Sequence, residues 1–294
     1  MTAAAVPQAG VVGYPIAQSL SPALHRHWLA RYGLPGRYDA VAVPPERFDA
    51  EMTRLLRRDG WRGLNVTVPH KQAAYRFVDR RDADAERLGA VNTVVVLPDG
   101  AIEGRNTDLY GFRRNLETAP GWAQVGRGPA VVLGAGGAAR AVIAALADLR
   151  FAEIRLLNRT LATAEALAEA LGPRLAAPIR PVPMTADAAA RALVGADLLA
   201  NTTSLGMTGQ PPLDLALDAL PQSALVTDIV YKPLITDLLA RAAARGNPTV
   251  DGLGMLLHQA APGFRAWFDP PQAPAVDAEL RAAVLAAMGG DAGA

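Results

Sequence analysis

The sequence predicts an α/β fold with mainly parallel strands, divided between two domains. Short runs of β-branched and apolar residues alternate with longer Ala- and Leu-rich helical patterns along the chain, which is typical of βαβ units. The chain has 294 residues, which exceeds the usual size of one domain. Near its middle, a glycine-rich turn stands between a buried-strand pattern and a helical pattern, as in doubly wound sheets.

The composition indicates a folded protein that acts on a small molecule. Hydrophobic residues make up 51% of the chain and charged residues 19%, which are values of a globular protein. Lys and Arg (29) nearly balance Asp and Glu (28), and no block of like charges suggests a nucleic-acid or membrane partner. We therefore expect a small-molecule substrate and either a monomer or a homodimer.

Other observations bear on metals and location. Cysteine is absent, which excludes disulfide scaffolds and thiolate chemistry and agrees with a reducing compartment. The spacing of His25, His27, His70 and His258 matches no metal-binding pattern, so we expect no metal. Residues 1–10 lack the pattern of a signal peptide, and no apolar run approaches the roughly 20 residues that span a bilayer. A cytoplasmic location is expected.

Three blocks divide the chain. Residues 1–108 carry strand and helix patterns ending in a hairpin at 98–100, and residues 252–294 are helical with a break at Pro270 and Pro271. The last block is too short for a core of its own, so we expect it to complete the first domain. Residues 109–251 form the other expected domain. Strands are expected at 10–13, 38–43, 64–68, 92–97, 129–133, 153–157, 198–202, 225–230 and 249–251, with helices at 136–149, 161–171 and 236–244.

The glycine-rich turn predicts a dinucleotide site in a Rossmann-type, doubly wound domain. It follows an apolar run and opens a helix, which is the context that the G-x-G-x-x-G/A pattern requires. Gly134 would make the tight turn, and Gly136 would let the backbone approach a pyrophosphate at the helix N-terminus. A glycine-rich turn without a ligand is the simpler alternative. The residues of the pattern are Gly134, Ala135, Gly136, Gly137 and Ala138.

The end of the next strand indicates which dinucleotide binds, because an acidic residue there would bond the ribose 2′-hydroxyl. This strand ends instead in Asn158, Arg159 and Thr160. A cation and two polar groups thus stand where a 2′-phosphate would lie, which favours NADP. Asn158 and Thr160 can also cap the following helix, and both roles can hold.

Two serines near the N-terminus predict an anion-binding turn. Ser19 and Ser21 lie between a strand and a helix whose first position is Pro22, so Ser21 is the expected N-cap. Hydroxyls and backbone N–H groups at such a place can hold a carboxylate. A simple helix cap is the alternative.

The run NVTVPHK predicts a substrate site with a proton-transfer residue. Strand alternation puts Asn65 and Thr67 on one face. Pro69 then begins a helix, so Lys71 falls in its first turn, where the helix dipole disfavours a cation. A lysine so placed could exchange a proton with a substrate hydroxyl, although a solvated surface lysine is the simpler interpretation of that residue alone.

Further polar residues interrupt apolar patterns. Asn92 stands in a strand pattern, where an Asn needs a partner. Asn106, Thr107 and Asp108 precede a helix, and capping explains one of them. Asp108 could complete a pair with Lys71 in which the carboxylate accepts from a substrate hydroxyl and steadies the ammonium.

Taken together, these segments resemble the shikimate dehydrogenase family over nearly the whole chain and in the family's order. The motifs that carry the resemblance are SLSP at 19–22, NVTVPHK at 65–71, AVNT at 90–93, NTD at 106–108, GAGGAAR at 134–140, NRT at 158–160, NTTSLGM at 201–207 and DGLGMLLHQ at 251–259.

The resemblance implies an NADP-dependent enzyme with an inserted Rossmann domain and a smaller catalytic domain, across a cleft that can close. It implies that Lys71 and Asp108 are the catalytic pair and that Gly252 and Met255 lie near the nicotinamide. Thr202 and Ser204 of NTTSLGM join the expected cofactor residues. The residues expected to hold shikimate are Ser19, Ser21, Asn65, Thr67, Asn92, Tyr231 and Gln259.

One departure from the family pattern concerns the cofactor. A second arginine is common four residues after the first, and this chain has Thr163 there, so one charge for the 2′-phosphate is missing. A quinate or dual quinate/shikimate dehydrogenase using NAD is therefore an alternative, against which Ser21 and Arg159 argue. A non-catalytic NADP-binding sensor is another, against which the retention of both Lys71 and Asp108 argues.

Overall fold

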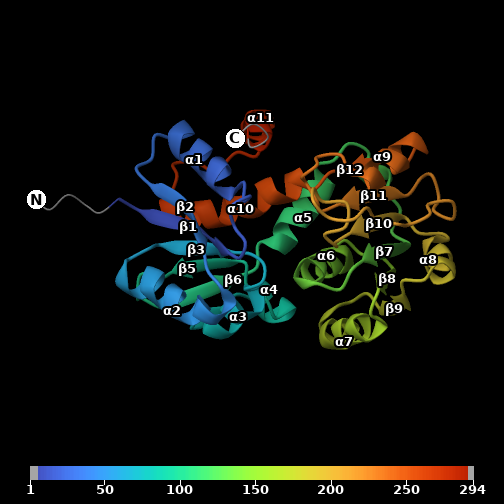
Figure 1. The fold of residues 1–294 in the computed structure, drawn as a ribbon, viewed down its shortest axis with the longest axis horizontal. Helices are drawn as coiled ribbons and strands as arrows, with labels where there is room; N and C mark the ends of the chain where they lie inside the picture. Colours follow the sequence, from blue (N-terminus) through green and yellow to red (C-terminus); the bar gives the residue numbers. More distant parts are fainter. Residues whose placement is uncertain (1–5, 291–294) are drawn as a thin grey trace, which may run out of the picture. The chain divides into compact units, whose positions relative to one another are not determined.

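The computed structural model describes residues 6–290. Residues 1–5, part of the segment expected to lack a signal peptide, and residues 291–294, the end of the expected helical block, lie outside the described residues. Contacts divide the chain into two units, Met1–Thr107 with Leu256–Ala294 (unit 1) and Asp108–Met255 (unit 2). Each unit contains one six-stranded sheet (Figure 1).

Unit 1 has a mixed sheet in the order β2-β1-β3-β5-β6-β4. β5 runs antiparallel to both neighbours, β3 and β6. The predicted turn at Pro98–Gly100 forms and joins β5 to β6 as a hairpin, with Gly100 at φ +82°. The expected strand at 64–68 ends early, at Val66. Its elements are β1 (Gln8–Gly13), α1 (Ser21–Arg31), β2 (Arg37–Ala42), α2 (Phe48–Thr53), β3 (Gly63–Val66), α3 (Lys71–Phe77), β4 (Arg80–Arg81), α4 (Ala83–Leu88), β5 (Thr93–Val96), β6 (Ile102–Arg105) and α11 (Ala278–Gly290), with α10 (Leu253–Phe268) beginning in unit 2.

Both faces of the unit 1 sheet are covered. On one face, Phe48 and Met52 of α2 pack with Leu64 and Val94 in a buried cluster. On the other, aromatic residues of α1 and α10 meet the sheet, and the Trp267 indole donates a 3.0 Å hydrogen bond to the Val94 carbonyl. The C-terminal helices thus bury their apolar faces in unit 1.

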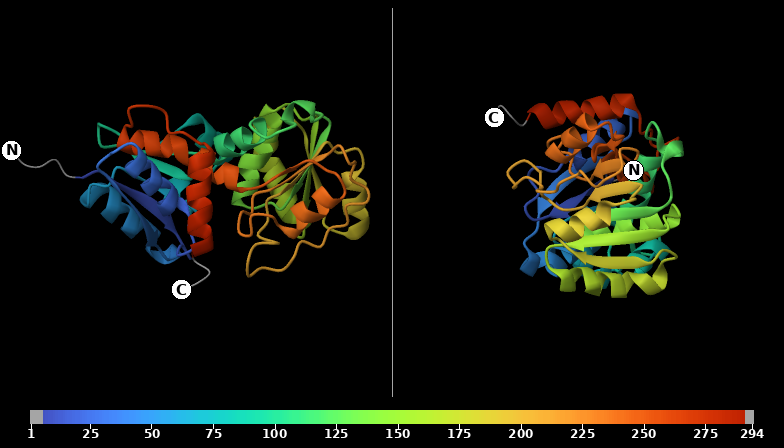
Figure 2. Two further views of the ribbon diagram at one scale, coloured as in Figure 1. Left: turned by 90° about the horizontal axis from the view of Figure 1, so that it is seen from above. Right: turned by 90° about the vertical axis from the view of Figure 1, so that its right-hand side faces the viewer.

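Unit 2 has a fully parallel sheet in the order β12-β11-β10-β7-β8-β9. Numbered along the unit, this is the 3-2-1-4-5-6 order of the Rossmann fold, whose direction of winding reverses between β7 and β10. Helices cover both faces of the sheet (Figure 2). Its elements are α5 (Asp108–Glu117), β7 (Pro129–Leu133), α6 (Gly137–Asp148), β8 (Glu153–Asn158), α7 (Leu161–Leu171), β9 (Ile179–Pro183), α8 (Ala186–Leu193), β10 (Leu198–Asn201), β11 (Leu225–Asp228), α9 (Asp237–Ala244) and β12 (Thr249–Val250).

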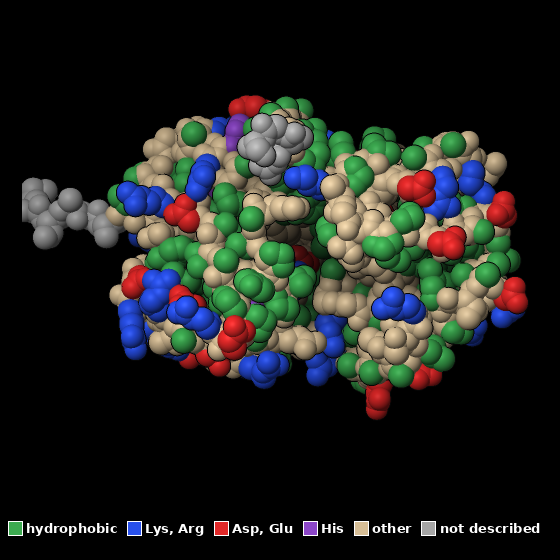
Figure 3. Space-filling view, viewed as in Figure 1, with side chains coloured by type: hydrophobic (Ala, Val, Ile, Leu, Met, Phe, Trp, Pro, Cys, Tyr) green, Lys and Arg blue, Asp and Glu red, His purple; other side chains and the backbone are tan. Residues whose placement is uncertain are grey.

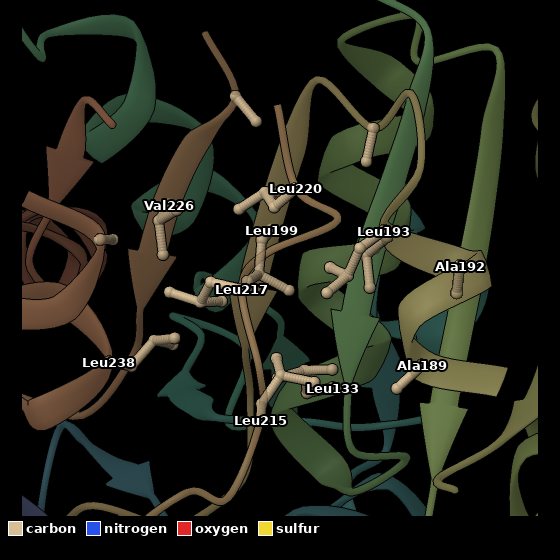
Figure 4. Packing of buried hydrophobic residues seen from close by; sticks show 14 of the residues in the cluster. Leu133, Ala189, Ala192, Leu193, Leu199, Leu215, Leu217, Leu220, Val226 and Leu238 are labelled. Atoms are coloured by element: carbon tan, nitrogen blue, oxygen red, sulfur yellow. The ribbon is translucent and has the colours of Figure 1, made fainter. Parts of the chain in front are cut away.

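The core on one face of this sheet joins strands, helices and a long connection. Leu133 and Leu199 of the sheet pack with Leu193 of α8, Leu238 of α9 and Leu217 of the segment before β11 (Figure 4). β9, which was not expected, is an edge strand containing two prolines, and edge positions tolerate the missing backbone donors.

Charged side chains of both signs are interspersed on the face shown in Figure 3. Arg57 pairs with Asp79 at 2.9 Å, and Arg241 pairs with Asp237 at 2.7 Å. Among residues 6–290, no helix has both the length and the apolar character needed to cross a membrane.

Candidate functional site

The glycine-rich turn of unit 2 has the backbone that a dinucleotide requires. Gly134 follows β7 at φ +93°, where a side chain would be strained. Its Cβ would also lie 2.7 Å from Thr203 Cγ2. Gly136 occupies the N-cap of α6 without a side-chain cap, and an added Cβ at Gly136 or Gly137 would meet no atom within 4 Å. The helix N-terminus therefore faces open space at the switch point of the sheet, where the fold binds phosphates.

At the end of β8, Arg159 is exposed and forms no ion pair or hydrogen bond with any residue in 6–290. Asn158 Nδ2 donates to the Thr160 carbonyl at 2.8 Å. Thr160 holds the N-cap position of α7, but its hydroxyl accepts no capping bond, so of the two alternatives the side-chain cap does not form. The Arg159 guanidinium and the Thr160 hydroxyl therefore remain available for a phosphate.

A buried polar network supports the loop after β10. Asp228 at the end of β11 is 1% exposed and accepts from Asn201 Nδ2 at 3.0 Å and from Thr236 Oγ1 at 2.8 Å. Burial raises the pKa of this carboxyl, and three hydrogen bonds to it act in the opposite direction. The network ties NTTSLGM to the segment that carries Tyr231, whose phenol has a pKa raised by burial.

Thr202 and Ser204 occupy different positions within that loop. The Thr202 hydroxyl donates to the Leu133 carbonyl at 2.7 Å, which fixes the loop to the end of β7. Ser204 is exposed. Of the two, Ser204 therefore has the hydroxyl more accessible to a ligand.

The segment 251–255 approaches the end of β11. A Cβ at Gly252 would lie 2.5 Å from the Ile229 carbonyl carbon and oxygen, so this approach requires glycine. Asn115 Nδ2 donates to the Asp251 carbonyl at 2.8 Å, and Met255 is buried at 8% exposure. The start of α10 is therefore held rigidly against unit 2.

In unit 1, two of the expected substrate segments lie side by side. The Tyr14 amide donates to the Val68 carbonyl at 3.0 Å, and the Thr67 amide donates to the Val12 carbonyl at 3.0 Å. A Cβ at Gly13 would lie 2.5 Å from Thr67 Cγ2. The turn that leads to the serines and the turn that follows β3 therefore meet at the carboxyl ends of adjacent strands.

The serine turn differs in one detail from expectation. Helix α1 begins at Ser21 itself, Leu20 holds the N-cap position, and no side-chain bond caps the helix. The Ser21 amide instead points to the Ser19 hydroxyl at 3.4 Å. The prediction of Ser21 as N-cap is wrong because the helix starts one residue earlier, which turns the Ser21 side chain into the protein at 6% exposure.

Asn65, Asn92 and Gln259 belong to one buried network in unit 1. Asn65 Nδ2 donates to Thr93 Oγ1 at 3.2 Å, and Thr93 Oγ1 donates to Asn92 Oδ1 at 3.1 Å. Asn92 Nδ2 reaches Thr107 Oγ1 at 3.1 Å and Gln259 Oε1 at 3.4 Å. The hydrogen-bond partners expected for Asn92 therefore exist, and they come from three segments of the chain, at Thr93, Thr107 and Gln259.

Helix α3 begins at Lys71 rather than at Pro69, with His70 at the N-cap position. Lys71 therefore lies in the first turn, as expected, and is half-buried. Its carbonyl accepts from the Val91 amide at 3.0 Å, which ties the start of α3 to the segment carrying Asn92. Asp108 begins α5 at 6% exposure and follows Thr107 directly in the chain. The candidate residues divide accordingly: Ser19, Ser21, Asn65, Thr67, Lys71, Asn92 and Gln259 lie in unit 1, and the others lie in unit 2.

Comparison with known proteins identifies the family. Residues 11–94 match the model of the shikimate dehydrogenase substrate binding domain. Shikimate dehydrogenase (NADP(+)) from Paramagnetospirillum magneticum is 57% identical over 280 residues, which cover 94% of this chain and 97% of that protein. The chain belongs to the shikimate dehydrogenase family.

Solved structures of this family share the fold. Shikimate 5-dehydrogenase from Thermus thermophilus, in complex with NADP(H) and shikimate, superposes with a TM-score of 0.82 at 35% identity, covering 96% of this chain and 99% of that one. Quinate dehydrogenase from Corynebacterium glutamicum, in complex with NAD, has a TM-score of 0.86 at 30% identity and the same coverages. The expected Rossmann-type fold is confirmed.

Sequence reasoning missed several buried polar residues that support the candidate site. Tyr38 donates to Asn65 Oδ1 at 2.6 Å, and His25 stacks on its ring. Asp228 holds the loop that carries Thr202 and Ser204. The one available signal for Asp228 was an acidic residue inside the apolar strand pattern expected at 225–230, where a buried carboxylate needs partners.

Proposed function

We propose that this chain catalyses the reversible NADP-dependent reduction of 3-dehydroshikimate to shikimate, a step in the biosynthesis of aromatic amino acids. The observation that carries the proposal is the buried network of unit 1. Amides and hydroxyls of Asn65, Asn92, Thr107 and Gln259 meet there, in the unit in which Lys71 opens a helix. A ligand rich in hydroxyl groups matches such a set of donors and acceptors.

The residues of unit 2 fit the cofactor. The open N-terminus of α6 would hold the pyrophosphate, since its backbone amides and dipole favour negative charge. Arg159 would bond the 2′-phosphate, because a guanidinium suits phosphate geometry. When bound, the nicotinamide supplies or accepts the hydride.

Lys71 handles the proton in this proposal. In the reductive direction its ammonium gives a proton to the carbonyl oxygen of the substrate, which becomes the C3 hydroxyl, and in the oxidative direction its amine takes that proton back. Asp108 accepts a hydrogen bond from the same hydroxyl and steadies the ammonium. This pairing follows from the family resemblance. Ser19 and Ser21 would hold the carboxylate, with Tyr231, and Thr67 would bond a ring hydroxyl.

A second candidate is a quinate/shikimate dehydrogenase that also accepts NAD. One observation favours it: Thr163, where the family commonly has a second arginine, is an exposed residue of α7. With one cation fewer, discrimination between NADP and NAD would be weaker.

One set of assays separates the candidates. Catalytic efficiencies are measured for shikimate and for quinate, each with NADP⁺ and with NAD⁺. We expect shikimate with NADP⁺ to exceed every other pair by at least about tenfold. Equal efficiencies for quinate would favour the dual enzyme. NADP binding without turnover of any pair would favour the sensor and would refute the proposed activity.

A further inference from the structure

We propose that Tyr38 is a positioning residue for substrate binding, whose buried hydroxyl sets the orientation of the Asn65 amide and, through it, that of Asn92. This inference rests on the proposed function, because it concerns the amides that would hold the substrate hydroxyls. Tyr38 lies on β2 at 1% exposure. It is not among the residues expected to touch substrate.

The position of the Tyr38 ring is fixed by its neighbours. It stacks on the His25 imidazole with centroids 3.9 Å apart and an interplanar angle of 6°. Trp267 lies 6.0 Å away, centroid to centroid. In this position the hydroxyl donates to the Asn65 Oδ1 atom at 2.6 Å.

That bond selects one of the two orientations of the Asn65 amide. With Oδ1 on the phenol, Nδ2 faces the Asn92 carbonyl at 3.4 Å and Thr93 Oγ1 at 3.2 Å. A flipped amide would set Oδ1 against the Asn92 carbonyl oxygen, which places two acceptors in contact. The phenol supplies the donor that the favoured orientation requires.

The direction of donation then continues through the network. Thr93 Oγ1 accepts from Asn65, and its own hydrogen has two acceptors in the network, Asn92 Oδ1 at 3.1 Å and Thr107 Oγ1 at 3.0 Å. The same Oδ1 accepts from the Thr107 amide at 2.7 Å. Nδ2 of Asn92 is thereby turned toward Thr107 Oγ1 and Gln259 Oε1. Chains of this kind gain strength because each bond polarises the next.

The protonation states at the start of the chain favour this direction. Burial raises the pKa of the Tyr38 phenol well above its ordinary value of 10.0, and a hydrogen bond with Ser21 offsets part of the rise. Burial also lowers the pKa of His25 to about 3. The Asn65 side chain offsets part of this fall, and the neutral imidazole stacks on the phenol.

Tyr38→Phe tests the inference, because it removes the hydroxyl and keeps the stacked ring. Asn65 Oδ1 then lacks its donor in a buried place. We expect the KM for shikimate to rise about tenfold, which is the effect of losing about one hydrogen bond. The KM for NADP⁺ should stay within twofold of wild type, since Gly134 and Arg159 lie in the other unit.

Tyr32→Phe is the matched control. Tyr32 lies in the same unit and against the same aromatic cluster, 6.3 Å from Phe264 between centroids. Its hydroxyl accepts from the Ala275 amide at 2.8 Å, away from the amide network. This variant should leave both KM values unchanged. An equal rise in the shikimate KM of both variants, or no rise in Tyr38→Phe, would overturn the positioning role.

Two further measurements separate a positioning role of Tyr38 from a general loss of packing in unit 1. They also separate failure of this inference from failure of the proposed function. In an Asn65→Ala background, Tyr38→Phe should change the shikimate KM by less than twofold, and a full additive effect would contradict the coupling. The side-chain amide NMR signals of Asn65 and Asn92 should shift in Tyr38→Phe and stay in place in Tyr32→Phe. An inactive wild type would refute the proposed function, while unmoved amide signals would refute the role of Tyr38 independently of activity.

Discussion

His25 should make the stability of this protein depend on pH in the range from about 6.5 to about 3. The imidazole is fully buried between Tyr38 and the rings of Trp28, Phe264 and Trp267, and burial lowers its pKa from 6.5 to about 3. In the unfolded chain it takes up a proton as the pH falls below 6.5, whereas in the folded chain it stays neutral. The stability from this group is therefore complete above pH 6.5 and is lost as the pH falls toward 3.

The size of the effect follows from the shift. Each pH unit between the two pKa values costs about 1.4 kcal/mol, so the loss between pH 6.5 and pH 5 is about 2 kcal/mol. This window lies above the range in which most carboxyl groups titrate. Variants that lack the His25 imidazole separate its contribution from those of the other three histidines.

This loss of stability is measured by urea unfolding at pH 8, 7, 6 and 5, with tryptophan fluorescence as the signal. His25→Phe keeps a stacked ring and His25→Leu keeps an apolar group, and neither titrates. Both variants should show a free energy of unfolding that falls by about 2 kcal/mol less than in wild type between pH 8 and pH 5. Their stability at pH 8 is not the test, because replacing an imidazole without partners can change it in either direction. If both variants retain the wild-type dependence on pH, His25 is not held neutral in the folded state.

Three other changes have defined outcomes. Lys71→Ala should lower kcat at least about a hundredfold, with a much smaller change in substrate affinity, in steady-state assays; near-normal turnover would remove Lys71 from the mechanism. Arg159→Ala should raise the KM for NADP⁺ and spare NAD⁺, and equal losses for both cofactors would contradict a phosphate role. Gly252→Ala should lower the free energy of unfolding by about 1–3 kcal/mol, because its Cβ would meet the Ile229 backbone at 2.5 Å. Gly172→Ala, where a Cβ meets no atom within 4 Å, is the matched control and should change stability by less than about 1 kcal/mol.

The sequence predicted the backbone of the glycine-rich turn well because its determinants are local. The positive φ of Gly134, the strand before it and the helix after it all lie within a few residues. The same holds for the hairpin at Gly100 and for the place of Lys71 in a first helical turn, although α3 starts two residues later than the expected Pro69. The N-cap at Ser21 was wrong because helix termini depend on small differences between neighbouring residues, and here the helix starts one residue early.

The buried residues that support the candidate substrate site could not be predicted in this way. Tyr38 and Asn65 are 27 residues apart, and they meet only because β2 and β3 flank β1 in a definite register. A Tyr in a strand pattern and a His in a helix pattern look like ordinary core residues. Their role follows from the order of strands, which no local pattern contains.

Asn92 shows both what the local sequence indicates and what only the fold determines. Its amide in an apolar pattern indicated that a partner must exist, because an unpaired buried amide is costly. The partners are Thr107, 15 residues away, and Gln259, 167 residues away. The second contact forms only because residues after Leu256 return to unit 1. A polar residue in an apolar run therefore indicates, from the local sequence, that hydrogen-bond partners are needed. Which residues become those partners depends on the fold. The proposed role of Tyr38 likewise depends on the fold and not on a local pattern.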